Sequence, residues 1–207
     1  MPKLKKTNAE IEIKLRITDI SAIRDKIKSL GPTPQLRVLE KNTLYDTPLS
    51  DLRRRGMLLR IRIETPAPEN NRATRGERVI LTSKAPPHLT PRRKPRRYKE
   101  RAERELVVKA QSSRQYAAAL TSLGFRPAFR YDKYRTTFRL PNLHLDLDET
   151  PAGTFLELEG KPQAIDRAAK ALGFAKKAYL RVTYWDLYVA DCRRRGSRPK
   201  NMLFRAK

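Results

Sequence analysis

Six segments of the chain carry charged residues at every second position, with aliphatic residues between them. In a β-strand, residues i and i+2 project from the same face, so each segment predicts a strand with one ionised face and one apolar face. The charged positions are Glu10/Glu12/Lys14, Arg60/Arg62, Glu103/Glu105, Lys133/Arg135, Asp146/Asp148 and Glu157/Glu159.

These ionised faces are sorted by charge, because several strands are acidic only and others basic only. For any single pair, an ordinary half-solvated sheet is the simpler interpretation, but such a sheet would pair opposite charges across strands. Neighbouring carboxylates repel one another and need a compensating cation. Six such strands in one chain favour a polar interior face, as in a closed barrel with a hydrophilic lumen.

The alternation and the turn residues predict about eight strands and three or four helices. Most strand connections are too short for a parallel crossover, so the sheet should be mainly antiparallel. We therefore expect an α+β fold: an eight-stranded, mainly antiparallel closed β-barrel, or tunnel, with a polar lumen and flanking helices. The expected strands are 10–17, 38–46, 57–64, 78–84, 103–109, 133–140, 143–148 and 154–159. The expected helices are one capped by Thr18 or Asp19 and running to Leu30, 112–123 and 163–172, while 48–56 is a turn or a short helix and 179–189 is a final amphipathic segment.

The formal net charge of +25 points to polyanionic partners. A Pro-rich stretch, 85–100, contributes +5 and the tail, 193–207, contributes +7. We expect one domain over 1–190, with 85–100 as a mobile basic insertion and 191–207 as a disordered basic tail. Both segments are candidates for nonspecific contact with a polyanion.

Other classes of protein are disfavoured by what the chain lacks. Cys192 is the only cysteine, which excludes an intramolecular disulfide, and with two histidines a structural zinc site is not expected. No apolar run reaches the ~20 residues that a membrane-spanning helix needs, and the chain starts without a signal-peptide core, so we expect a cytoplasmic protein.

A lumen lined by both signs of charge suits a phosphate ligand bound together with a metal ion. Arginine and lysine hold phosphoryl oxygens, and carboxylate clusters hold hard divalent cations such as Mg²⁺ or Mn²⁺. The sequence has no GxxxxGK[ST] motif, so side chains rather than a backbone loop would hold the phosphates.

In this pattern the sequence resembles the CYTH domain, the family of triphosphate tunnel metalloenzymes that includes class IV adenylyl cyclases and thiamine triphosphatases. Glu10-x-Glu12-x-Lys14 matches the ExExK signature of that family. Further matches follow in the same order as in the family. They are Tyr45-Asp46-Thr47-Pro48, Leu58-x-Arg60-x-Arg62, Leu81-Thr-Ser-Lys84, Glu103-x-Glu105, Lys133-x-Arg135, Asp146-x-Asp148, Glu157-x-Glu159 and Thr183-Tyr184-x-Asp186-Leu187.

The resemblance implies roles for these residues. Lys14, Arg60, Arg62, Lys84, Lys133 and Arg135 would contact phosphates, and Lys14, Arg62, Glu12 and Lys133 would be catalytic. Glu10, Glu12, Glu157 and Glu159 would hold Mg²⁺ or Mn²⁺, with Glu103, Glu105, Asp146 and Asp148 as further candidates. Asp146 and Asp148 could equally be salt-bridge partners in the lumen.

The leading interpretation is a divalent-metal-dependent phosphohydrolase that cleaves a small triphosphate: inorganic triphosphate, a nucleoside triphosphate or thiamine triphosphate. One alternative is a class IV adenylyl cyclase, which converts ATP to cyclic AMP and pyrophosphate. A second is a non-enzymatic binder of polyphosphate or nucleic acid. The sequence leaves the oligomeric state open, a homodimer being one option because many relatives are dimers.

Overall fold

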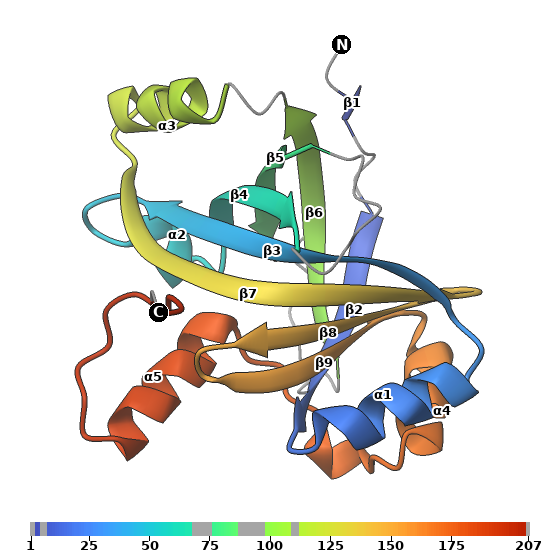
Figure 1. Cartoon of the computed structure of the whole chain (residues 1–207). Coiled ribbons are helices and arrows are strands. Elements are labelled where there is room, and N and C mark those ends of the chain that lie inside the picture. Colours follow the sequence, from blue (N-terminus) through green and yellow to red (C-terminus); the bar gives the residue numbers. More distant parts are fainter. Residues whose placement is uncertain (1–2, 5–7, 68–75, 87–97, 109–111, 206–207) are drawn as a thin grey trace.

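The fold is a single antiparallel sheet that closes on itself (Figure 1). The computed structural model describes residues 3–4, 8–67, 76–86, 98–108 and 112–205. The strands are β1 (Lys3–Leu4), β2 (Asn8–Ile17), β3 (Thr33–Asp46), β4 (Leu58–Pro66), β5 (Arg78–Ala85), β6 (Lys99–Val108), β7 (Arg126–Leu140), β8 (Leu143–Thr150) and β9 (Gly153–Gly160).

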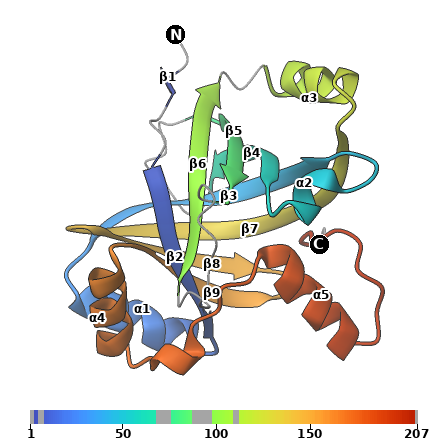
Figure 2. The same ribbon diagram turned by 180° about the vertical axis from the view of Figure 1, so that it is seen from behind.

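Eight of these strands make the barrel, in the order β6-β2-β9-β8-β7-β3-β4-β5, and the pairing of β5 with β6 closes it. Every pairing is antiparallel. The short β1 pairs with the end of β6, along the same edge of β6 that pairs with β2. Figure 2, the view from behind, shows β2 and β6 running across the barrel in front of its other strands. The expected eight-stranded antiparallel tunnel is therefore confirmed.

Among the described residues, five α-helices flank the barrel, and the largest apolar cluster lies beneath two of them. The helices are α1 (Ile20–Ser29), α2 (Asp51–Arg54), α3 (Ser113–Ser122), α4 (Pro162–Ala171) and α5 (Tyr184–Arg194), with a short 3-10 turn at Lys176–Ala178. Ile27 of α1 and Ile165 of α4 are fully buried against the outward residues of β2, β8 and β9, such as Leu15. The apolar faces therefore pack outward and leave the ionised faces in the lumen.

Asp19 caps the start of α1, because its carboxylate accepts a hydrogen bond from the Ala22 amide at 2.9 Å. Gly31, just after the helix, has a φ of +67°, a conformation that glycine adopts without strain. None of the described helices is long and apolar enough to cross a membrane.

The basic insertion differs from its expected boundaries. Lys99 and Glu100 belong to β6, so this strand begins four residues earlier than the alternation at Glu103 suggests. The core of the expected mobile loop, residues 87–97, lies outside the described residues.

The prediction of a disordered tail is wrong for residues 191–205. Helix α5 continues to Arg194, and the chain that follows returns to β7. The amide of Met202 donates to the Arg130 carbonyl at 2.9 Å, and the Asp132 amide donates to the Met202 carbonyl at 2.9 Å. The Met202 side chain is 1% exposed and packs beside Phe129. One buried side chain and a few backbone bonds hold a segment that has no apolar periodicity.

Replacing Met202 by alanine should therefore lower the free energy of unfolding by about 2–4 kcal/mol, because it leaves a cavity between the tail and β7. Chemical denaturation measures this loss. Leu203→Ala is the matched control: its side chain is 42% exposed, so the cost should stay within about 0.5 kcal/mol. Equal costs for the two variants would show that the tail does not pack in this way.

Candidate functional site

The ionised faces of the strands line one cavity of about 1370 Å³ inside the barrel. All six cations expected to contact phosphate line it, as do seven of the eight candidate metal-binding carboxylates. Seven strands contribute these side chains. The alternation of charged residues at every second position therefore places residues that are far apart in sequence around one cavity. The residues are Lys14, Arg60, Arg62, Lys84, Lys133, Arg135, Glu10, Glu12, Glu103, Glu105, Asp146, Glu157 and Glu159.

Asp148 is the exception, because it lies behind the cations instead of facing the cavity. It is fully buried and absent from the cavity lining. Its carboxylate accepts hydrogen bonds from Lys133 Nζ at 2.8 Å, Arg135 Nη2 at 2.6 Å and the Tyr184 hydroxyl at 2.5 Å. With its oxygens committed to these donors, Asp148 fits the salt-bridge alternative better than a metal ligand.

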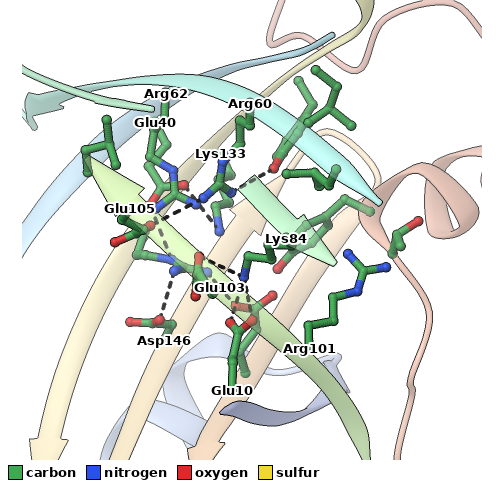
Figure 3. Close-up of a pocket in the computed structure, with 18 of the residues that line it drawn as sticks. Glu10, Glu40, Arg60, Arg62, Lys84, Arg101, Glu103, Glu105, Lys133 and Asp146 are labelled. Carbon is green, nitrogen blue, oxygen red and sulfur yellow. Dashed lines mark hydrogen bonds and ion pairs between the residues drawn. The ribbon is translucent and has the colours of Figure 1, made fainter. Parts of the chain in front are cut away.

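A buried carboxylate, Glu40, supports the basic side of the cavity. It is 0% exposed, and its oxygens lie 3.1 Å from Arg62 Nη1, 3.3 Å from Lys133 Nζ and 3.5 Å from Arg135 Nε. Burial alone would raise the pKa of Glu40, but these cations outweigh it and hold the pKa well below its usual range. Figure 3 shows Glu40 beside Arg62 and Lys133. Glu40 therefore holds three phosphate-binding candidates together.

Neutral side chains orient the two arginines of β4. Arg62 Nε donates to Asn42 Oδ1 at 3.0 Å. Arg60 Nη2 donates to Thr82 Oγ1 at 3.1 Å, and its Nη1 lies 3.4 Å from the Tyr131 hydroxyl. Both guanidinium groups are buried and held before any ligand arrives, a property that favours binding in one defined geometry.

Lys14, from the ExExK motif, lies between two acids. Its Nζ is 3.0 Å from Glu12 Oε1 and 3.0 Å from Glu157 Oε1. Burial would lower the pKa of Lys14, but these carboxylates outweigh it and raise the pKa above its usual value. Lys99 Nζ also lies 2.5 Å from Glu12 Oε1. Burial and the charge of Lys14 nevertheless lower the pKa of Lys99 to about 8.

The other side of the cavity has an excess of carboxylates. Lys84 Nζ is shared by Glu10 at 2.6 Å and Glu103 at 3.1 Å (Figure 3). No described residue forms an ion pair or hydrogen bond with Glu159. Burial, followed by the charge of Glu10, raises the pKa of Glu159 to about 8. Burial also raises the pKa values of Glu103 and Asp146. In this group the carboxylates outnumber the cations that could neutralise them.

The acidic side offers the right chemistry for a hard divalent cation. Mg²⁺ prefers oxygen ligands and usually takes only one or two protein carboxylates, completing its shell with waters and substrate phosphates. Glu159 supplies such oxygens without an ion pair to any described residue. Its neighbours have few cations between them, since Glu10 and Glu103 share one lysine and Asp146 lies 2.9 Å from Arg135 Nη1. Within the described part of the chain, however, no group of three or more acidic, histidine or cysteine side chains is arranged as a ready metal cage. The donor set therefore fits Mg²⁺ or Mn²⁺ as an open site.

The raised pKa of Glu159 predicts a pH effect on stability. A carboxyl group whose pKa rises on folding from 4.5 to about 8 binds a proton in the folded state, so stability falls as the pH rises through that window. Glu159→Gln removes the effect. In thermal unfolding without divalent metal, the melting temperature of Glu159→Gln relative to that of the wild type should therefore increase as the pH rises from about 5 to about 8.

The matched control for this pH effect is Glu77→Gln, which changes an exposed carboxylate. Its melting temperature should follow that of the wild type at every pH. A constant difference between Glu159→Gln and the wild type across the window would contradict the raised pKa.

Several residues that line the cavity or support its lining were not predicted from the sequence. Glu40 and Asn42 lie two apart on β3, but a single acid beside an amide is a weaker signal than a pair of like charges. Lys99 and Arg101 continue the alternation of β6 toward its start, and both line the cavity. The same alternation of charged residues, extended four residues before Glu103, identifies both of them.

Helix α5 covers one side of the cavity. Its start is fixed by a capping box, in which Asp186 N donates to Thr183 Oγ1 and Thr183 N donates to Asp186 Oδ2. This cap directs Tyr184 inward, where its ring centroid lies 5.0 Å from Lys133 Nζ. Trp185 also lines the cavity. The Thr183-Tyr184-x-Asp186 motif therefore joins the closing helix to the basic side of the lumen.

Comparisons with known proteins agree with this geometry. The CYTH domain model matches residues 8–181. A search of the curated proteins finds no match.

Solved structures share the fold. A protein from Pyrococcus horikoshii OT3 has a TM-score of 0.69 at 23% identity, covering 87% of this chain and 98% of its own. A putative adenylate cyclase from Vibrio parahaemolyticus has a TM-score of 0.66 at 16% identity, covering 88% and 98%. A putative adenylyl cyclase from Hippeastrum, described as having a dominant triphosphatase activity, has a TM-score of 0.56 at 21% identity, covering 92% and 97%.

Proposed function

The chain belongs to the CYTH family, and on that basis we propose that it is a divalent-metal-dependent phosphohydrolase that cleaves a small triphosphate. Inorganic triphosphate, a nucleoside triphosphate and thiamine triphosphate are the candidate substrates. The Hippeastrum protein, described as both a putative adenylyl cyclase and a triphosphatase, associates both reactions with this fold. Hydrolysis is the function that we put first.

The observation that carries the proposal is one cavity inside the barrel, with Arg60, Arg62 and Lys133 clustered toward one side and an excess of carboxylates toward the other. Lys14, Arg60, Arg62, Lys84, Lys133 and Arg135 would contact the phosphate oxygens. The guanidinium groups can bind two phosphoryl oxygens at once, whereas the lysines act as point charges. Because Glu40, Asn42 and Thr82 already orient the cations of β4 and β7, little reorganisation of these groups is needed when charge develops on the reacting phosphoryl group.

The carboxylates on the opposite side would hold the metal ion. Glu159, Glu10, Glu103 and Asp146 are the residues that the charge distribution favours. Glu12 and Glu157 of the motif set pair with Lys14, and Glu105 lies 3.7 Å from Arg60. When bound, Mg²⁺ or Mn²⁺ supplies Lewis-acid polarisation of the phosphoryl group.

The reaction that we propose is attack of water on the terminal phosphorus. A new P–O bond forms, the P–O bond to the leaving diphosphate breaks, and orthophosphate is released. The cavity residues bind and orient the phosphate chain, and the walls of the barrel limit access of other nucleophiles. Cyclisation would instead require the ribose 3′-hydroxyl of ATP to reach the α-phosphorus.

A product assay over a triphosphate panel tests the proposal. Purified protein is incubated with inorganic triphosphate, ATP or thiamine triphosphate, with Mg²⁺ or Mn²⁺ and with a chelator as control. Metal-dependent release of orthophosphate from at least one substrate is the expected result. Cyclic AMP and pyrophosphate as the only products would favour the cyclase alternative, and turnover of none of the substrates would overturn both.

A further inference from the structure

The tail returns to the barrel at a place where other arginines are exposed. We call this surface the arginine face. It includes the end of α2, the start of β7, the end of α5 and the chain after α5. Its exposed members are Arg53, Arg54, Arg55, Arg126, Arg130, Arg193, Arg194, Arg195, Arg198, Lys200 and Arg205.

Contacts between these elements make the arginine face continuous. The Arg53 guanidinium lies 4.8 Å from the centroid of the Trp185 ring, which joins α2 to α5. The Arg130 amide donates to Asn201 Oδ1 at 2.9 Å, and the Tyr188 hydroxyl donates to the Asn201 carbonyl at 3.0 Å. These bonds join the tail to both β7 and α5. Figures 1 and 2 both show the last described part of the tail, up to residue 205, turning back toward α2.

The arginine face has little acidic compensation. Residues 50–57, 126–130 and 184–205 together contain eleven basic and three acidic residues, a net charge of +8. The three acids are already engaged: Asp51 pairs with Arg54, Asp191 with Arg194 and Arg195, and Asp186 with its capping box. Several arginines remain without an ion pair to any described residue. They are Arg55, Arg126, Arg130, Arg193 and Arg198.

The composition of the face suits nucleic acid better than other polyanions. Ten of the eleven basic residues are arginines, which bind phosphate with a planar fork and also stack on bases. Phe204, 37% exposed, lies on the same tail with its ring centroid 5.3 Å from that of Tyr134, and the partly exposed Trp185 lies beside Arg53. Aromatic platforms between cations are typical of single-strand binding. Inorganic polyphosphate has no apolar part that would use them.

We propose that the arginine face binds single-stranded nucleic acid through its phosphates, without sequence preference. Arg53 and Trp185 also line the cavity, so a bound strand would run past its α2–α5 side. The binding does not depend on hydrolysis in the tunnel and is a second property of the molecule. It gives the basic tail a role that the triphosphate site does not require.

Binding of a fluorescent single-stranded RNA with a 5′-hydroxyl end tests the proposal, because this probe carries no triphosphate for the tunnel. The face variant is Arg55→Glu/Arg193→Glu/Arg198→Glu, which changes three exposed and unpaired arginines on three segments. The control variant is Lys161→Glu/Arg167→Glu/Lys170→Glu on and beside α4, which changes net charge equally at exposed positions elsewhere. Melting temperatures check that both variants are folded.

The face variant should bind RNA at least about tenfold more weakly at physiological salt. Its plot of log affinity against log salt should be shallower by about 2, since each lost phosphate contact removes about 0.7. The control variant should bind like the wild type. Equal weakening in both variants, or no binding by the wild type at physiological salt, would overturn the proposal.

Two further measurements separate this surface from other ligands and from the tunnel. Unlabelled single-stranded RNA should displace the probe more effectively, per phosphate, than inorganic polyphosphate. The reverse order would overturn the assignment to nucleic acid. Arg60→Ala/Arg62→Ala, which disrupts the tunnel, should leave RNA binding unchanged; loss of binding there would place the RNA in the tunnel and contradict the proposal.

Discussion

Replacing Arg62 by alanine is expected to lower kcat/KM for triphosphate hydrolysis by about 10³-fold. The guanidinium is buried in the lumen and is held by Glu40 and Asn42, so it is oriented before substrate binds. Removing it takes away donors directed at the charge that develops on the phosphoryl group. Orthophosphate release under saturating metal, measured over a range of substrate concentrations, gives the loss.

The matched control for this loss is Arg104→Ala. Arg104 is an exposed arginine on β6, between Glu103 and Glu105, and its side chain does not line the cavity. This variant should keep kcat/KM within about twofold of the wild type, as for other surface substitutions. If Arg62→Ala retained near wild-type activity, Arg62 would not belong to the catalytic site.

Replacing Glu40 by glutamine is expected to lower the free energy of unfolding by about 3–5 kcal/mol. Glu40 is fully buried under Arg62, Lys133 and Arg135, and glutamine keeps its size but removes its charge. The cations would then repel one another with less compensation. Chemical denaturation near neutral pH, in the absence of phosphate ligands, measures the change.

A second measurement shows whether the loss at Glu40 comes from the cations. Inorganic phosphate or triphosphate should stabilise Glu40→Gln more than the wild type, because an added anion replaces the missing charge. The exposed Glu77→Gln is again the control and should change stability by no more than about 0.5 kcal/mol. A Glu40→Gln variant within 1 kcal/mol of the wild type would contradict the role given to this carboxylate.

The cavity could be predicted from the sequence because its walls follow a simple geometric rule. Alternating residues of a strand point to opposite faces, so the pairs at Arg60/Arg62 and Glu157/Glu159 are directed inward once the outward aliphatic residues pack under helices. Closure of the sheet then brings these faces together. No knowledge of distant contacts is needed to select such pairs.

The support beneath the cavity was harder to predict, because it depends on which residues become neighbours across strands. Glu40 acts as a common partner for cations of β4 and β7 only in the register that pairs β3 with both strands. Asp148 has the same spacing as the lining acids, yet Tyr184 of α5 occupies one of its oxygens. Neither fact is encoded in a local pattern.

The tail shows a different limit. Its sequence lacks periodicity and is strongly basic, which is typical of disorder. The Met202 side chain is nevertheless buried in one apolar cluster with Phe129 and Tyr188, and backbone hydrogen bonds join Met202 to β7. A single anchor residue is too weak a signal to read before the fold is known. Its consequence, however, is large, because it places the tail arginines beside α2.

Binding of a triphosphate on the basic side of the lumen can be measured by calorimetric titration. A non-hydrolysable triphosphate analogue, titrated in the presence of Mg²⁺, should bind with one site per chain. Arg60→Ala/Arg62→Ala should weaken this binding by about 100-fold or more, since hydrogen bonds to charged groups contribute about 1.5–3 kcal/mol each. Arg104→Ala should bind with wild-type affinity. Equal affinities for the tunnel variant and the wild type would show that the triphosphate does not bind at the arginines of the lumen.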